Sequence, residues 1–353
     1  MAAAMAACGS DETTGFDEES SDQRSVDTAE VFAELGDATP GCAVGVDHPD
    51  GAHVDGFGMA DLDAGSSITP ATIFDLASVS KQLTGGVVAA LVERGDVDLD
   101  APVSEYVDDL GSAVDGVIVA DLVHHTSGLP DYGDLLDAGD DETTTNGDVV
   151  DVLAAEVAGP DFDPGTEFEY SNSNYVLLAL LAEGVTGRSF VDLSNDLIFD
   201  PLDMDATVVR DDQGPLLDGQ AQGYAEDGEG DWEPVGSSWR QTGDGAVHST
   251  VVDMLDWARL FFGDVPDVPD GVGSSAWLEL MLTGGEVDDD GVPYGFGIGI
   301  DDGGGTLTHS GSWIGYGSVL TILPDEGIAV AIACNIDGYH VEAAAAEVLA
   351  IWQ

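Results

Sequence analysis

The stretch Leu76-Ala77-Ser78-Val79-Ser80-Lys81 lies directly before an apolar run and contains the only lysine of the chain. Because residues three apart share one face of a helix, the hydroxyl of Ser78 and the amine of Lys81 are expected one turn apart. Apolar residues recur at helical spacing from Gln82 to Gly95, which predicts a helix that the glycine ends. Ser78 would then lie at a helix N-terminus, where unpaired N–H groups favour negative charge. These features indicate a serine nucleophile that the amine can deprotonate, although a serine three residues before a lysine is also a common coincidence.

A second group of polar residues lies ahead of another predicted helix. Pro164-Gly165 forms a turn, Tyr170 and Asn172 follow it, and residues 175–185 are apolar at helical spacing. A tyrosine hydroxyl can transfer protons, and an asparagine amide can both donate and accept hydrogen bonds. The simpler alternative is a packed tyrosine ring and an asparagine that caps the helix.

A third group, His309-Ser310-Gly311-Ser312, lies on a strand predicted near the C-terminus. A glycine in that strand would let a substrate lie along the sheet edge through main-chain hydrogen bonds. The N–H of Ser312, together with that of Ser78, is expected to form an oxyanion hole. Each group alone is a weak signal, whereas the three together in this order are specific.

Ser78-x-x-Lys81, Tyr170-x-Asn172 and His309-x-Gly311 together resemble the three ordered motifs of the class C β-lactamase and penicillin-binding serine hydrolase family. The likeness extends from about Val26 to the C-terminus. It implies an α+β fold, in which an antiparallel sheet flanked by helices carries an inserted all-helical region. The implied divisions are a disordered acidic tail (1–25), a sheet domain (26–77 and 245–353) and a helical domain (78–244).

The resemblance also implies a role for each motif residue. Ser78 would be the nucleophile of an acyl-enzyme mechanism, and Lys81 and Tyr170 would share the acid–base steps. Which of these two is the acylation base stays open. The substrate would be a small molecule (a β-lactam, an ester or a small amide), and neither a metal nor a cofactor is implied. The substrate-binding residues would be Asn172, His309, Ser310, Gly311 and Ser312.

The third motif departs from that of typical β-lactamases, which begins with a lysine where this chain has His309. A histidine is only partly charged near neutral pH, so it would attract a substrate carboxylate less firmly. In this respect the chain resembles carboxylesterases and D-amino-acid peptidases as much as β-lactamases. Two other classes stay open: a non-catalytic binding module on the same fold, and a metal hydrolase that uses carboxylates with His124, His125 or His248. We expect these three histidines to have structural roles at helix ends.

The charge of the chain is extreme, with 70 acidic residues against seven basic ones and a formal net charge of −63. The acidic residues are spread along the whole sequence, so we interpret them as an adaptation to a high-salt environment that screens their repulsion. The lack of a basic patch excludes nucleic acids and anionic membranes as partners. No apolar stretch is long enough to span a bilayer. Small residues before Cys8 resemble the end of a lipoprotein signal, which leaves the location open between the cytoplasm and a tethered position at the cell surface.

Further patterns outline the sheet domain. A helix is predicted from Val26, a hairpin over 40–62, and a closing helix from Val341 to Trp352. Cys42 and Cys334 each lie in a strand-like apolar run and are interpreted as small buried hydrophobic residues, with no disulfide framework. The remaining strands are predicted over 294–300, 306–312, 317–323 and 327–335.

Overall fold

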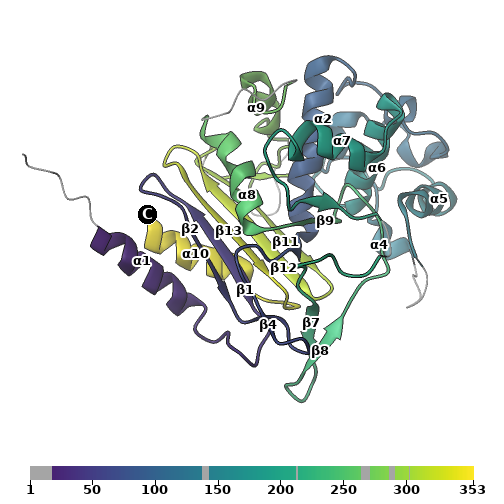
Figure 1. Cartoon of the computed structure of the whole chain (residues 1–353). Coiled ribbons are helices and arrows are strands. Elements are labelled where there is room, and N and C mark those ends of the chain that lie inside the picture. The colour runs from purple at the N-terminus through teal and green to yellow at the C-terminus, as the bar shows by residue number, and fades with distance from the viewer. Residues whose placement is uncertain (1–17, 137–142, 212–213, 264–270, 286–290, 302) are drawn as a thin grey trace, which may run out of the picture.

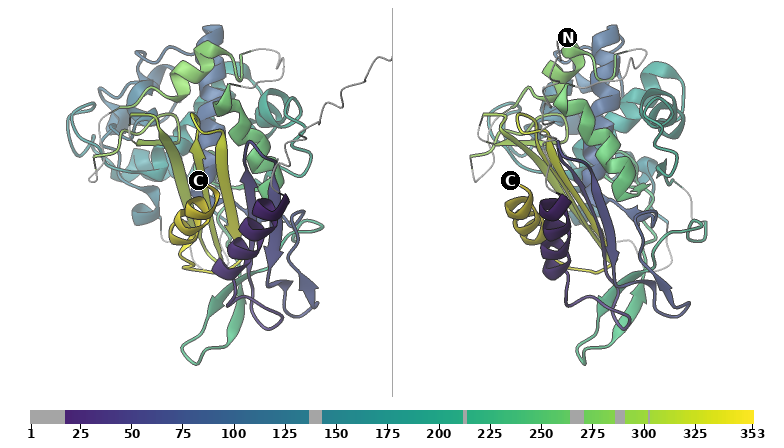
Figure 2. Two further views of the ribbon diagram at one scale, coloured as in Figure 1. Left: turned by 90° about the vertical axis from the view of Figure 1, so that its left-hand side faces the viewer. Right: turned by 60° about the vertical axis from the view of Figure 1, so that its left-hand side comes forward.

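The structure, a computed structural model, describes residues 18–136, 143–211, 214–263, 271–285, 291–301 and 303–353. An antiparallel sheet of six strands forms one layer, in the order β10-β11-β12-β13-β1-β2. Helices α1 and α10 cover one face of this sheet, and helix α8 packs on the other face, where the helical region lies (Figures 1 and 2). The predicted architecture, an antiparallel sheet flanked by helices with a helical region beside it, is confirmed.

The strands of the main sheet come from both ends of the chain. They are β1 (Cys42–Asp47), β2 (His53–Phe57), β10 (Gly299–Asp301), β11 (Thr306–Trp313), β12 (Tyr316–Leu323) and β13 (Ile328–Cys334). Shorter strands are β3 (Met59–Asp61), β4 (Ser66–Ser67), β5 (Phe74–Asp75), β6 (Val208–Val209), β7 (Gly223–Glu226), β8 (Trp232–Val235) and β9 (Val247–Ser249).

Most of the helices lie between the two groups of sheet strands in the sequence. The α-helices are α1 (Glu18–Val31), α2 (Ser80–Arg94), α3 (Val119–Val123), α4 (Tyr132–Leu135), α5 (Asn146–Glu156), α6 (Asn172–Thr186), α7 (Phe190–Ser194), α8 (Val251–Ala258), α9 (Ser275–Met281) and α10 (Val341–Trp352). Short 3-10 turns are η1 (Ala77–Val79), η2 (Val103–Glu105), η3 (Gly111–Val114) and η5 (Arg259–Phe262), and η4 (Asn195–Phe199) is a π-helical turn.

Strand β13 lies in the middle of the sheet and is apolar along its whole length. All of its residues are buried, because α10 covers one face and α8 the other. A continuous apolar run is typical of a strand covered on both faces, and the strand predicted over 327–335 is confirmed. Helix α10 has the predicted bounds, and Gly95 ends α2 in the left-handed conformation expected of a C-terminal glycine.

The cysteines correct the sequence interpretation. Cys42 and Cys334 are fully buried as expected, yet they are joined by a disulfide across 292 residues of sequence. In the antiparallel register of β1 and β13 the two residues stand directly opposite each other, with their Cα atoms 4.0 Å apart. Local sequence does not reveal this pairing, because the register depends on the closure of the whole sheet.

Two predicted boundaries are also wrong. Helix α1 begins at Glu18 instead of Val26, so residues 18–25 are helical although the sequence assigned them to a disordered tail. Residues 1–17, which include Cys8, lie outside the described residues. The strand predicted over 294–300 is limited to β10, because Tyr294 forms only an isolated bridge. The division into a sheet domain and a helical domain at residues 78 and 244 stays a prediction.

Helix α2 joins the sheet to the helical region and carries the Ser78–Lys81 stretch at its start (Figure 1). Its backbone packs directly on the segment before β10: a Cβ on Gly297 would come within 2.2 Å of the carbonyl oxygen of Lys81. Gly297 also has a positive φ of 80°, so both the space and the conformation require glycine. This contact fixes the first turn of α2 against the sheet.

We expect the disulfide to stabilise the fold, because it closes a very long loop in the unfolded chain. Replacing Cys42 with serine should lower the free energy of unfolding by about 2–4 kcal/mol. The measurement is denaturant unfolding followed by circular dichroism, with Cys8→Ser as the control. Alkylation of Cys42 and Cys334 in unfolded protein without a reductant would contradict the disulfide.

Candidate active site

Ser78 lies in the turn η1, directly before α2. Ala77 beside it has a positive φ of 48°, a conformation that residues with side chains rarely adopt and that often marks a functional turn. Strand β11 passes close behind this turn. A Cβ on Gly311 would come within 2.4 Å of the Leu76 carbonyl oxygen and 2.9 Å of the Ser78 nitrogen. Only glycine fits at this position, so the third motif is held against the serine.

Lys81 is fully buried, and its amine is surrounded by oxygen atoms from three separate segments. Its Nζ lies 3.1 Å from Ser78 Oγ, 2.7 Å from Asn172 Oδ1 and 2.8 Å from the main-chain oxygen of Asp244. These contacts bring together the first motif, the start of α6 and the loop before β9. Of the predicted site residues, Ser78, Lys81 and Asn172 thus lie within hydrogen-bonding distance of one another through the Lys81 amine.

The three contacts of the amine differ in chemical character. Amide and main-chain oxygens only accept hydrogen bonds, so Asn172 and Asp244 each take one N–H of Lys81. The third direction points to the Ser78 hydroxyl, which can either accept or donate. When the amine is neutral, its two N–H groups point to Asn172 and Asp244. Its lone pair then points to the Ser78 hydroxyl and can accept the serine proton. The arrangement can therefore move a proton between the hydroxyl and the amine.

Tyr170 lies beside Lys81 but contacts it through its ring. Lys81 Nζ is 5.1 Å from the centre of the Tyr170 ring, a distance typical of a cation–π contact. The tyrosine is 39% exposed. Among the described residues, no hydrogen bond joins its hydroxyl to Ser78 or Lys81. The structure thus places Tyr170 at the site without placing its oxygen on the reacting hydroxyl.

His309 is held as a neutral imidazole by both of its neighbours. Its Nδ1 lies 2.6 Å from the carbonyl oxygen of Ser310, which can only accept, so Nδ1 carries the proton. Its Nε2 then accepts from the hydroxyl of Tyr294 at 2.8 Å. Desolvation, with the nearby charge of Lys81, lowers the pKa of His309 to about 3. The expectation of a partly charged histidine near neutral pH is therefore wrong, because burial and two hydrogen bonds favour the neutral form.

His125 has the structural role that was expected of it at a helix end, and it packs beneath the site. It is fully buried, and its ring packs against the rings of Tyr170, Tyr175 and Tyr294 with centroids 4.4–5.1 Å apart. Its Nδ1 accepts the N–H of Ser171 at 3.2 Å. Burial, followed by the charge of Lys81, lowers its pKa well below 6.5. His125 therefore forms a neutral aromatic layer under the site.

The other two histidines occupy different positions. His124 Nδ1 lies 2.8 Å from the carbonyl oxygen of Tyr294, and His248 Nε2 lies 3.8 Å from the Asp75 carboxylate. The described parts of the chain hold no group of three His, Cys, Asp or Glu side chains arranged to bind a metal. The described helices also include none that is both long and apolar enough to cross a bilayer.

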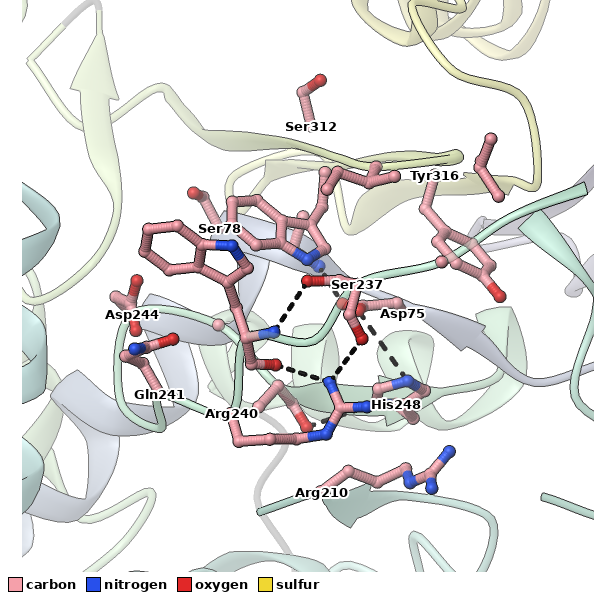
Figure 3. A pocket seen from close by; sticks show the side chains of 18 of the residues that line it. Asp75, Ser78, Arg210, Ser237, Arg240, Gln241, Asp244, His248, Ser312 and Tyr316 are labelled. Carbon is pink, nitrogen blue, oxygen red and sulfur yellow. Dashed lines mark hydrogen bonds and ion pairs between the residues drawn. The ribbon is translucent and has the colours of Figure 1, made fainter. Parts of the chain in front are cut away.

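A cavity of about 300 Å³ opens beside Ser78 (Figure 3). Asn172 and Ser312 from the predicted site line it, as do Trp239 and Trp313, whose rings meet edge to face at 6.1 Å. A pocket of this size, lined by both aromatic and polar side chains, suits a small organic substrate.

The polar wall of this cavity is not predicted from the sequence. Asp244 and Gln241 line it, together with Arg210 and Arg240. The hydroxyl of Tyr132 donates to Asp244 Oδ2 at 2.7 Å. Desolvation raises the pKa of Asp244 to about 6, although the charge of Lys81 opposes this. The local sequence at Asp244 is an aspartate between two glycines, a pattern that is typical of an ordinary loop.

We expect His309 to stay neutral across the neutral pH range. Its pKa is about 3 in the folded chain and near 6.5 in the unfolded chain, so the unfolded state binds more protons between these values. The contribution of this group therefore makes the fold less stable as the pH falls from 6.5 towards 3. The imidazole nitrogen shifts of His309, followed by NMR, should not titrate between pH 5 and pH 8. Titration near pH 6.5 would contradict the buried neutral form, and the spectrum of His309→Gln assigns the signal.

Comparisons with known proteins agree with this geometry. The Beta-lactamase family model matches residues 28–351. Penicillin-binding protein 4* of Bacillus subtilis is 30% identical over 281 residues, which cover 75% of this chain and 61% of that protein. A D-aminopeptidase of Brucella ovis is 31% identical over 294 residues, which cover 82% of this chain and 54% of that protein. The chain thus spans between half and two thirds of the length of these curated relatives.

A solved structure shares the fold over nearly the whole chain. The octameric penicillin-binding protein homologue from Pyrococcus abyssi superposes with a TM-score of 0.80 at 26% identity, covering 95% of this chain and 77% of that one. A penicillin-binding protein from Bacillus halodurans has the same fold, with a TM-score of 0.77 at 22% identity over 93% of this chain and 97% of that one. With a family match over almost its full length and an amine–hydroxyl pair at the expected place, the chain belongs to the β-lactamase family.

Proposed function

We propose that the protein is a serine acyl hydrolase that forms an acyl-enzyme on Ser78. The observation that carries this proposal is the buried amine of Lys81, held 3.1 Å from Ser78 Oγ by two acceptors that occupy its other hydrogen bonds. Lys81 takes the hydroxyl proton while Oγ attacks the substrate carbonyl. The leaving alcohol or amine departs with a proton, and water later hydrolyses the ester to release the acid and restore Ser78.

The remaining motif residues complete this mechanism as substrate contacts. The main-chain N–H groups of Ser78 and Ser312 would bind the developing oxyanion, which the contact between Gly311 and the serine turn supports. Asn172 would hold both Lys81 and the substrate, because its amide can serve each side. We assign the acylation base to Lys81 and give Tyr170 a supporting role through its ring.

The substrate class is inferred from the neutral form of His309 in the third motif. Because His309 carries no charge near pH 7, it offers no cation to a substrate carboxylate. This favours esters and small amides over the carboxylate-bearing β-lactams of class C enzymes. The names of the relatives, penicillin-binding protein and D-aminopeptidase, support an acyl donor related to D-amino acids. A non-catalytic binding module is disfavoured, since the nucleophile and the amine are both in place.

We also propose a high-salt environment and an oligomeric assembly to test for this protein. A formal net charge of −63 supports a protein that works in concentrated salt. The relative from Pyrococcus abyssi is described as octameric, so a higher oligomer is one assembly to test.

The nucleophile is tested by labelling in molar KCl with a fluorescent phosphonate, followed by peptide mass spectrometry. Ser78 should carry the label, and Ser78→Ala should abolish it, while Ser104→Ala, at an exposed serine, should label normally. Lys81→Arg keeps a positive charge but cannot act as a base at neutral pH. It should slow acylation by roughly 100-fold to 10,000-fold. Folded protein whose Ser78 stays unlabelled would end the proposal.

The salt dependence is a separate prediction. At about 1 M salt the screening length falls to about 3 Å, so repulsion among the carboxylates is nearly removed. The thermal unfolding midpoint should therefore rise steeply when KCl is raised from about 0.1 M to above 1 M. Differential scanning fluorimetry measures it, and sucrose at matched osmolarity is the control. A midpoint that does not change with salt would show that the acidic surface is not an adaptation to salt.

A further inference from the structure

The peptide group between Leu76 and Ala77 is held by a side chain at each of its two ends. Its carbonyl oxygen, on Leu76, accepts a hydrogen bond from Ser318 Oγ at 2.6 Å. Its N–H, on Ala77, donates to Asp75 Oδ1 at 2.8 Å. Asp75 ends β5, whereas Ser318 is fully buried on β12. Two segments that are distant in sequence therefore fix the peptide that directly precedes the N–H of Ser78.

The orientation of this peptide sets the conformation of Ala77. The angle φ of Ala77 describes how the preceding peptide is turned about its Cα, and its value is 48°. This left-handed region is unfavourable for a residue with a Cβ and persists only where surrounding contacts enforce it. The N–H of Val79 also donates to the Leu76 oxygen at 3.1 Å, within the turn itself. Rotating the peptide away would break the bonds from both side chains, so these bonds hold Ala77 in its unusual conformation.

The conformation of Ala77 in turn sets the direction of the next N–H, which belongs to Ser78. The main chain of β11 lies close to this nitrogen because residue 311 is a glycine. A Cβ on Gly311 would come within 2.9 Å of the Ser78 nitrogen and 2.7 Å of Ser318 Oγ. The glycine thus makes room both for the nitrogen and for the hydroxyl that holds the preceding peptide. An oxyanion-hole donor is effective only when it is aimed in advance at the developing charge.

We propose that Asp75 and Ser318 are positioning residues for the reaction at Ser78. They hold the Leu76–Ala77 peptide, this peptide keeps Ala77 left-handed, and Ala77 aims the Ser78 N–H at the oxyanion. The inference rests on the proposed serine hydrolase function and on the oxyanion hole assigned there. In this role both side chains act through the backbone and need no contact with the substrate.

Asp75 also has a charged form and a second neighbour, which gives the test its alternative. Its Oδ2 lies 3.8 Å from Nε2 of His248, the residue opposite it in the pairing of β5 with β9 (Figure 3). If Asp75 acts through its charge, on His248 or on the cavity, any neutral replacement loses that role. The positioning role requires only an oxygen that accepts from the Ala77 N–H, which an asparagine also has. One substitution therefore separates the two roles.

The test measures kcat and KM for 4-nitrophenyl acetate in molar KCl, with rates expressed per Ser78 that a fluorescent phosphonate labels. Asp75→Ala should lower kcat by roughly 10-fold to 100-fold, less than the loss of a whole oxyanion donor, because the donor is misdirected and not removed. KM should change little, since this interaction develops in the transition state. Asp75→Asn should restore most of the lost rate. Ser318→Ala should lower kcat in the same way, because it frees the other end of the peptide.

A second substitution tests whether the effect passes through Ala77. Glycine adopts a positive φ without strain, so it keeps the turn accessible when a holding side chain is lost. The double variant Asp75→Ala/Ala77→Gly should therefore be roughly threefold or more faster than Asp75→Ala. A role of Asp75 in charge or in general stability would gain nothing from glycine at position 77. Ser318→Ala/Ala77→Gly gives the same comparison if Asp75→Ala does not fold.

The possible results separate the inference from the function on which it rests. Asp75→Asn as slow as Asp75→Ala, Ser318→Ala at the wild-type rate, or no gain from Ala77→Gly would each overturn the positioning role and leave the serine hydrolase in place. A wild-type protein that neither hydrolyses the ester nor is labelled at Ser78 would overturn the proposed function, and the positioning role with it.

Discussion

The buried amine of Lys81 is the contact on which the rest of the site depends. A charged amine taken out of water is tolerated only when oxygen atoms replace its hydration. Here these atoms come from Ser78 in the same helix, Asn172 at the start of α6 and the main chain of Asp244. Each segment is fixed by other contacts: the serine turn by Gly311 of β11, and the first turn of α2 by Gly297. Lys81 therefore lies where the sheet and the helical region meet, and contacts from both fix the segments around its amine.

The imidazole and phenol rings around Lys81 are neutral, so the positive charge of this group of residues lies on the Lys81 amine. His125 is buried and His309 half-buried next to the amine, and its charge helps to lower the pKa of both imidazoles. Tyr170 and Tyr175 turn their rings towards Nζ at 5.1 and 5.8 Å. These rings pack around the amine, which is the group that contacts the serine hydroxyl.

Features of the fold and the site that depend on local spacing could be predicted from the sequence. Features that depend on how distant segments come together in the fold could not. A serine and a lysine three residues apart must share a helix face, and an apolar run such as β13 must be covered on both sides. By contrast, the disulfide depends on the register of two strands that are far apart in sequence. Asp244 was missed because its importance lies in what packs on it, and the sequence around it does not differ from that of an ordinary loop. The placement of the Tyr170 hydroxyl, likewise, depends on a rotamer that the motif does not specify.

The substitution of histidine for lysine in the third motif has a consequence for the whole cavity. A lysine at position 309 would be a second amine near Lys81, in a space already lined by aromatic rings. Neutral His309 instead binds Tyr294 and Ser310 through its two nitrogens, which completes a rigid wall without added charge. The charges that remain in the cavity wall are then Asp75 and Asp244, with Arg210 and Arg240. These charged side chains lie on β5 and on the segments between β6 and β9, so the charge in the cavity wall comes from outside the motif strand β11.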